Sequence, residues 1–122
     1  MNNYLKQQQP VKIPVPGNKI IEEHFGKVAT KSDDFSLAHM QAPSGWSEPA
    51  QKPDFDEITI MVKGRMKILI NDNEEFIINA GESFMSRKGV KIQYSNPFEE
   101  ANEYWSVCIP AFSPETVNRQ ES

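Results

Sequence analysis

The chain has 122 residues, of which 38% are hydrophobic and 25% are charged, and its formal net charge at pH 7 is −4. This length suits one domain with a single core. The acidic balance argues against nucleic-acid binding, which needs a basic surface to neutralise phosphates, and the short apolar runs exclude a membrane-spanning helix. The single cysteine, Cys108, excludes an internal disulfide, and the start of the chain lacks a signal-peptide pattern, so we expect a cytoplasmic protein.

An extended arm is predicted for residues 1–17. The first ten residues are polar and rich in glutamine, and Pro14 and Pro16 forbid a central strand because proline has no amide hydrogen to donate. Residues 18–28 are compatible with a short helix or a strand, and their β-branched residues and glycines favour the strand. The arm should therefore lie at the edge of a sheet.

The rest of the chain is predicted to form short strands separated by turns. Residues 35–41 alternate in polarity, so four of them share one strand face: Phe35, Leu37, His39 and Gln41. After a proline-broken loop, apolar segments predict strands at residues 57–63, 65–70, 75–79, 83–87, 90–95 and 103–109. Turn signals at intervals of about eight to twelve residues indicate an all-β sandwich or barrel, and about eight strands suit a double-sheet jelly roll.

One stretch of the chain resembles the first motif of the cupin superfamily, G-x5-H-x-H-x3,4-E-x6-G. Counted from Gly45, the glutamate of the motif falls on Glu57 and its closing glycine on Gly64. The two histidines of the motif fall on Gln51 and Pro53.

A second stretch resembles the second cupin motif, G-x5-P-x-G-x2-H-x3-N. Counted from Gly81, its second glycine falls on Gly89 and its asparagine on Asn96. Its proline falls on Arg87 and its histidine on Ile92.

The histidines with which cupins bind a metal are therefore replaced by Gln51, Pro53 and Ile92. A mononuclear Fe, Mn, Ni or Zn site needs three or four nitrogen, oxygen or sulfur ligands. We expect no standard metal centre and predict no cofactor. A divalent ion held by Glu57, Gln51 and His39 is the alternative.

The resemblance implies a single all-β domain, a cupin-type double-stranded β-helix or jelly-roll barrel at residues 18–114. The extended arm at residues 1–17 would precede it, and a polar tail at residues 115–122 would follow. Residues 46–49, 55–57 and 107–114 look like a branch of small single-domain cupins. A homodimer is also implied, because cupins often pair by extending a sheet or by exchanging an N-terminal arm.

Glu57 is the first candidate for catalysis, because the resemblance points its side chain into the barrel. An inward carboxylate must be hydrogen-bonded or have its pKa raised by burial, and either state suits general acid/base chemistry. The alternative is a carboxylate that caps the loop or pairs with a basic residue. His39 and Tyr94 are candidates for the complementary group, because histidine shuttles protons near neutral pH and Tyr94 shares a strand face with Ile92. For both, core packing is the alternative.

Contacts with a substrate are expected from five further residues: Gln51, Gln41, Thr59, Met61 and Trp46. Gln51 would hydrogen-bond a hydroxyl or carbonyl group, or else lie exposed in the loop. Trp46 would stack on a ligand ring, or else seal the rim of the barrel. The other three share strand faces with the candidate catalytic residues.

The two faces of the last strand carry different side chains. One face has Tyr104, Ser106 and Cys108, and the other has Glu103, Trp105 and Val107. Either face is compatible with the inside of the barrel. We expect Cys108 to be a buried, inert thiol, because no cationic neighbour in the sequence would lower its pKa.

Three functions remain open for a chain whose expected partner is a small molecule. The first is a metal-independent enzyme (isomerase, epimerase, dehydratase or lyase) with Glu57 as acid or base, His39 or Tyr94 as the complementary group and Gln51 as an orienting donor. The second is a non-catalytic module that binds a sugar or another metabolite. The third is a divalent-metal cupin with a non-standard site. A fold alone does not choose among them.

Overall fold

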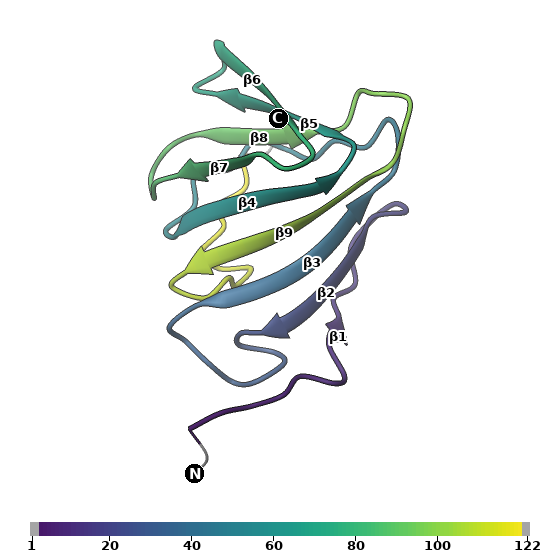
Figure 1. Cartoon of the computed structure of the whole chain (residues 1–122). Coiled ribbons are helices and arrows are strands. Elements are labelled where there is room, and N and C mark those ends of the chain that lie inside the picture. Colours follow the sequence, from purple (N-terminus) through teal and green to yellow (C-terminus); the bar gives the residue numbers. More distant parts are fainter. Residues whose placement is uncertain (1–2, 121–122) are drawn as a thin grey trace.

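The protein is built from β-strands (Figure 1). The computed structural model describes residues 3–120, and within that range it contains nine strands and no helix. The strands are β1 (Val11–Lys12), β2 (Ile20–Phe25), β3 (Ser36–Ala42), β4 (Asp56–Lys63), β5 (Arg65–Ile70), β6 (Glu74–Asn79), β7 (Ser83–Ser86), β8 (Ile92–Ser95) and β9 (Asn102–Ile109). Accordingly, no helix in this part of the chain is long and apolar enough to cross a membrane.

Two antiparallel sheets make up the barrel. The larger sheet has the strand order β1-β2-β3-β9-β4-β7, and the smaller sheet has the order β6-β5-β8. Strands β3, β9 and β4, which lie far apart in the sequence, form the centre of the larger sheet (Figure 1). The predicted all-β jelly roll is confirmed, and the segment at residues 18–28 forms a strand rather than a helix.

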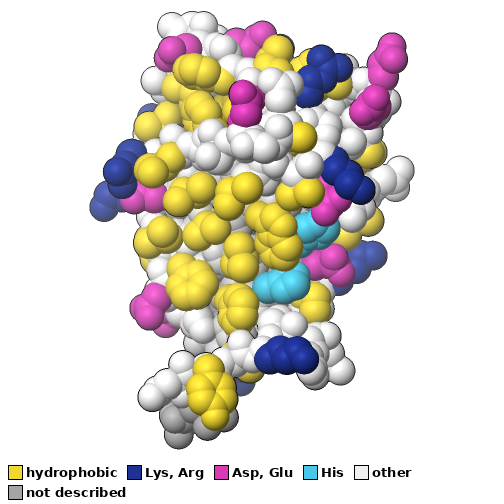
Figure 2. Space-filling view, viewed as in Figure 1, with side chains coloured by type: hydrophobic (Ala, Val, Ile, Leu, Met, Phe, Trp, Pro, Cys, Tyr) yellow, Lys and Arg dark blue, Asp and Glu magenta, His cyan; other side chains and the backbone are white. Residues whose placement is uncertain are grey.

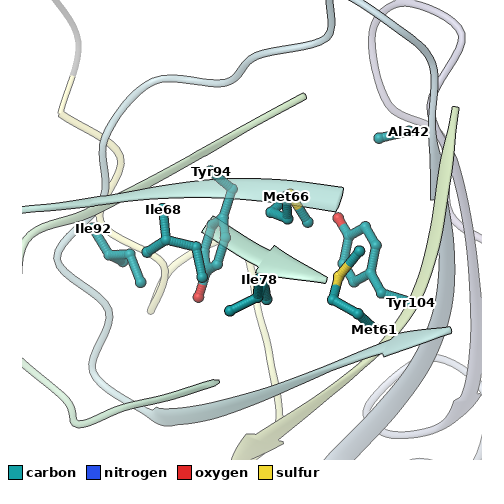
Figure 3. Close-up of a cluster of buried hydrophobic side chains, with 8 residues drawn as sticks. All are labelled: Ala42, Met61, Met66, Ile68, Ile78, Ile92, Tyr94 and Tyr104. Carbon is teal, nitrogen blue, oxygen red and sulfur yellow. The ribbon is translucent and has the colours of Figure 1, made fainter. Parts of the chain in front are cut away.

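The core lies between the two sheets. Eight buried side chains from six strands pack together there: Ala42, Met61, Met66, Ile68, Ile78, Ile92, Tyr94 and Tyr104 (Figure 3). A smaller cluster joins Phe55, Cys108 and Val117, with Phe112 packed against it. Burial of these apolar surfaces is the main force that holds the sheets together.

Alternation along β9 decides which of its faces lines the interior. Tyr104, Ser106 and Cys108 are buried, whereas Trp105 and Val107 are half-buried on the outer side. Cys108 is therefore buried, as expected from the sequence.

The closing glycine of the first motif lies in the tight connection between β4 and β5. Gly64 has a φ angle of 75°, and a Cβ atom there would lie 3.0 Å from the carbonyl oxygen of Ala101. Glycine alone accepts both this backbone angle and this close approach without strain.

Segments near both ends of the described chain pack on the barrel. In the predicted arm, β1 pairs with β2 at the edge of the larger sheet. The segment at 115–120, expected to be a polar tail, instead follows the loop at 50–54: the Asp54 amide donates to Thr116, and the Gln120 amide donates to Ala50. The outermost parts of the predicted arm and tail, residues 1–2 and 121–122, lie outside the described residues.

The outer face of the larger sheet carries an apolar patch. Its most exposed members are between 40% and 51% exposed and come from β4, β7 and β9: Ile60, Val62, Met85 and Ile109. Trp105 and Val107 pair with β4 and extend the patch across the sheet. Figure 2 shows hydrophobic side chains gathered over the middle of this face, with the two histidines beside them.

Candidate functional site

A chamber of about 90 Å³ lies inside the barrel, against the inner face of the larger sheet. It continues into a vestibule of about 920 Å³ at the barrel mouth. Seven residues line both spaces: Ile13, Val15, Lys19, Ile21, Glu48, Phe112 and Arg119. Because one water occupies roughly 30 Å³ in the liquid, the chamber has room for a small group of a few heavy atoms.

Glu57 presents its carboxylate to this chamber from β4. The Tyr94 hydroxyl donates a hydrogen bond of 2.8 Å to Oε1, and the Ser106 hydroxyl donates one of 2.5 Å to Oε2. Burial raises the pKa of Glu57, and these two hydrogen bonds oppose the rise. The result is a carboxyl group that holds its proton to a higher pH than a solvated glutamate does.

Tyr94 is a fixed hydrogen-bond donor beside this carboxyl group. Burial raises the pKa of the Tyr94 phenol well above its ordinary value, and the charge of Glu57 adds to the rise. The hydroxyl group therefore stays protonated at neutral pH.

Cys108 lies near the same carboxylate, with Sγ 3.9 Å from Oε2 of Glu57. Burial raises the pKa of the thiol, and the Glu57 charge raises it further. A thiol in this state is a poor nucleophile.

Gln51 belongs to the chamber lining and has a buried, unpaired amide oxygen. Its side chain is 4% exposed, and Oε1 has no hydrogen-bond partner among the residues that the structure describes. The backbone is held in place, because Gln51 and Ile92 exchange two hydrogen bonds of 2.8 and 2.9 Å. An unpaired buried acceptor costs about 1–3 kcal/mol, a cost that a ligand donor would remove.

Lys19, which the sequence analysis did not single out, lines both the chamber and the vestibule. Its Nζ lies 4.0 Å from the centre of the Trp46 ring and 5.4 Å from that of Tyr104. Burial lowers the pKa of Lys19, and the charges of Glu48 and Glu57 oppose the change. One feature of the sequence could have identified it. Lys19 lies two residues before Ile21 in the predicted strand, so the two side chains share one strand face.

Four of the residues predicted from the sequence come together in the chamber: Glu57, Gln51, Thr59 and Tyr94. Trp46 lies outside it, in the wall of the vestibule. Met61, expected to contact substrate, instead packs in the hydrophobic core with 2% of its surface exposed.

His39 and Gln41 lie on the opposite side of the sheet from the chamber. The inner face of β3 carries the even-numbered side chains, of which Ser36, Ala38 and Met40 line the chamber. On the outer face, Nε2 of His39 lies 2.7 Å from Glu103. The prediction that His39 shares a pocket with Glu57 is therefore wrong, because residues one apart on a strand face opposite ways.

The side chains at the motif's metal positions do not fit a metal centre. Ile92 is apolar and 1% exposed in the core, and Pro53 is buried without a side-chain donor. Glu57 and Gln51 alone offer oxygen atoms, and the alternative set with His39 is not brought together. Within residues 3–120, no three His, Cys, Asp or Glu side chains gather in a way that could hold a metal ion.

Comparison with known sequences identifies one long match. The chain matches no protein-family model. Over 108 residues, or 88% of the chain, it is 44% identical to "Endoribonuclease YbeY" from Myxococcus xanthus (strain DK1622). The chain spans 36% of the length of that curated relative.

Solved structures with a similar fold cover nearly the whole chain. The polyketide cyclase RemF from Streptomyces resistomycificus matches 100% of this chain and 88% of its own, with a TM-score of 0.77 and 12% identity. An RmlC-like cupin family protein with a double-stranded β-helix fold, from Methanocaldococcus jannaschii, matches 88% of this chain and 87% of its own, with a TM-score of 0.65 and 19% identity.

Proposed function

Because this chain has the cupin fold, a double-stranded β-helix, we propose that its chamber binds a small polar metabolite and transforms it by acid/base chemistry without a metal. The observation that carries the proposal is the Glu57 carboxyl group, which faces an internal chamber while Tyr94 and Ser106 donate to its two oxygens. A carboxyl group whose pKa is raised by burial is suited to exchange protons with a ligand.

The chemistry follows from these positions. In its ionised form Glu57 takes a proton from a carbon or hydroxyl group of the ligand, and in its protonated form it returns that proton. Return to a neighbouring carbon gives an isomerase, return to the opposite face of the same carbon gives an epimerase, and return to a leaving hydroxyl group gives a dehydratase, which is a lyase. The Tyr94 hydroxyl holds the carboxyl group in position through its hydrogen bond to Oε1 while the proton moves.

The names of the similar proteins bear on this proposal in different ways. A polyketide cyclase has the same fold, which supports the inside of this barrel as a site for an organic ligand. The endoribonuclease activity named for the Myxococcus xanthus relative belongs to a protein of which this chain spans 36%. A net charge of −4 favours a small molecule over RNA as the partner of this chain.

Proton transfer can be tested before the substrate is known. Purified protein is incubated in D2O with a panel of small 2-hydroxy, 2-oxo and 2-amino acids, sugar acids and neutral sugars, and deuterium incorporation is followed by NMR. We expect incorporation into at least one compound, and a loss of about a hundredfold or more in Glu57→Gln. The control is Glu99→Gln, which alters an exposed glutamate far from the chamber lining.

A non-catalytic binding module is the second candidate, favoured by the unpaired Gln51 amide, which binds a ligand without any proton transfer. Thermal stabilisation by panel compounds without deuterium exchange would support it over the enzyme. A panel that gives neither stabilisation nor exchange would contradict both.

We also propose that the chain pairs with a second copy through the apolar outer face of the larger sheet. Three strands, two of eight residues and one of four, at about 4.8 Å spacing and about 3.3 Å rise, give a face on the order of 300 Å² in projection. A stable dimer needs about 800 Å² of accessible surface per partner, so the interface would also include the neighbouring strand β3. Two-fold packing sets this uncharged patch against itself.

A single, buried, free cysteine supports a cytoplasmic location.

A further inference from the structure

Within the described part of the chain, the lining of the chamber includes polar groups without a hydrogen-bond or ion-pair partner, and two of them differ in kind. One is the amine of Lys19 and the other is the buried hydrogen-bond acceptor Oε1 of Gln51, and both residues belong to the chamber lining. We infer that the ligand is a small hydroxy or amino acid, whose carboxylate contacts Lys19 and whose hydroxyl or amino group donates to Gln51. This inference rests on the proposed function and names the substrate class of the same chamber.

The other charged side chains of the chamber lining already have partners. Arg119 lies 3.1 Å from Glu48, so these two charges satisfy each other at the mouth. Glu57 accepts from two hydroxyl groups, as described above. The remaining carboxylate, Glu23, accepts hydrogen bonds of 2.9 and 2.7 Å from backbone amides of the following turn.

Lys19 differs from all of these. No carboxylate lies within 4.0 Å of its Nζ in the part of the chain that the structure describes, and the amine lies over the faces of two aromatic rings. Aromatic faces attract a cation but do not neutralise its charge. Burial also lowers the pKa of Lys19, and a bound carboxylate would reverse that effect.

The size and charge of the site favour a monoanion over a phosphate ester. A single unpaired amine matches one negative charge, whereas phosphate recognition usually gathers several donors or a bidentate arginine. The one arginine of the lining is engaged by Glu48. A carboxylate with a hydroxyl or amino group on a short carbon chain suits a chamber of about 90 Å³ that opens to a vestibule.

Pairs of compounds that differ in one chemical group test the Lys19 contact and the Gln51 contact separately. Calorimetric titration compares lactate with lactamide, which replaces the carboxylate, and with propionate, which lacks the hydroxyl group. The aromatic pair 4-hydroxybenzoate and 4-hydroxybenzamide extends the comparison to a ligand that reaches the vestibule. For the wild-type protein we expect at least one acid to bind about tenfold or more tightly than its amide.

Variants then test which residue causes each binding preference. Lys19→Met keeps the apolar stem and should abolish the preference for acid over amide, while Lys19→Arg should retain it. The control is Lys52→Met, an exposed lysine outside the chamber lining. Gln51→Leu should abolish the preference for lactate over propionate. Melting temperatures close to that of the wild type verify that each variant is folded.

Equal binding of acid and amide to the wild-type protein would overturn the inference, as would an acid preference that survives in Lys19→Met. If sugars or neutral compounds stabilise the protein but none of these acids binds, the ligand class is wrong and the proposed function stands. If no compound of either set binds, the proposed function itself fails.

Discussion

At Glu57, burial and hydrogen bonding act on one carboxyl group in opposite directions. Burial has the larger effect, so the pKa in the folded state lies above its ordinary value of 4.5. Between pH 4.5 and the raised pKa of the folded state, the folded protein binds more protons than the unfolded protein. The stability that this proton contributes is present in full below the ordinary value and is lost as the pH rises through the raised pKa.

This balance predicts a pH-dependent difference between the wild type and Glu57→Gln. Glutamine is neutral at every pH, so the variant should gain stability relative to the wild type as the pH rises from about 4 to about 8. Urea unfolding at a series of pH values measures the difference in the free energy of unfolding. A difference that stays constant with pH, or that favours the wild type at higher pH, would show that the Glu57 pKa is not raised.

Individual residues show which parts of the site could be predicted from the sequence and which could not. The motif spacing identified Glu57, and Tyr94 followed from its strand face, because both inferences use local periodicity. The faces of β3 were misassigned, because only its register with β9 places the side chain of His39 outside the barrel. Lys19 was missed because its position matters only once the folded chain brings it against Trp46 and Tyr104.

At the scale of elements, the strands were predictable because alternation and turn residues are local signals. The segment at residues 65–70 forms β5 with the predicted bounds, and the predicted strand at 103–109 differs from β9 by one residue. The packing of residues 115–120 was not predictable, because it depends on hydrogen bonds to a loop more than sixty residues earlier in the chain.

The turn after β8 depends on the asparagine that ends the second motif. Asn96 is fully buried, its Oδ1 accepts from the amide of Phe98, and its Nδ2 donates to three carbonyl oxygens: those of Ala42, Pro43 and Glu100. Asn96→Ala should lower the free energy of unfolding by about 2–4 kcal/mol, because it leaves buried backbone groups unpaired. Urea unfolding measures the loss.

The matched control is Asn73→Ala in the exposed turn between β5 and β6. It should change the free energy of unfolding by no more than about 0.5 kcal/mol. Equal effects of the two substitutions would mean that the hydrogen bonds of Asn96 do not hold the turn.

For the whole molecule, the two faces of the larger sheet have separate roles in our proposals. The inner face builds the chamber, and the outer face presents an apolar patch (Figure 2), to which we assign a second copy of the chain. We predict that the wild type sediments as a dimer and that Ile60→Glu or Met85→Glu shifts it to the monomer, because each buries a charge in the patch. Analytical ultracentrifugation over a range of concentrations measures the change.

A control for this prediction lies on the smaller sheet. Ile77 of β6 is 48% exposed, similar to Met85 at 51%, but is not part of the patch. Ile77→Glu should leave the dimer intact. A wild-type monomer at all concentrations, or dissociation caused equally by Ile77→Glu, would contradict the assignment of this face.

The central claim is that the chamber beside Glu57 is the ligand site of this protein. A crystal structure of the protein soaked with the compound that binds most tightly tests it most directly. We predict ligand density inside the chamber, with one ligand atom within hydrogen-bond distance of Glu57 and another within that distance of Gln51. An empty chamber, with the ligand bound only on the outer surface, would contradict the claim.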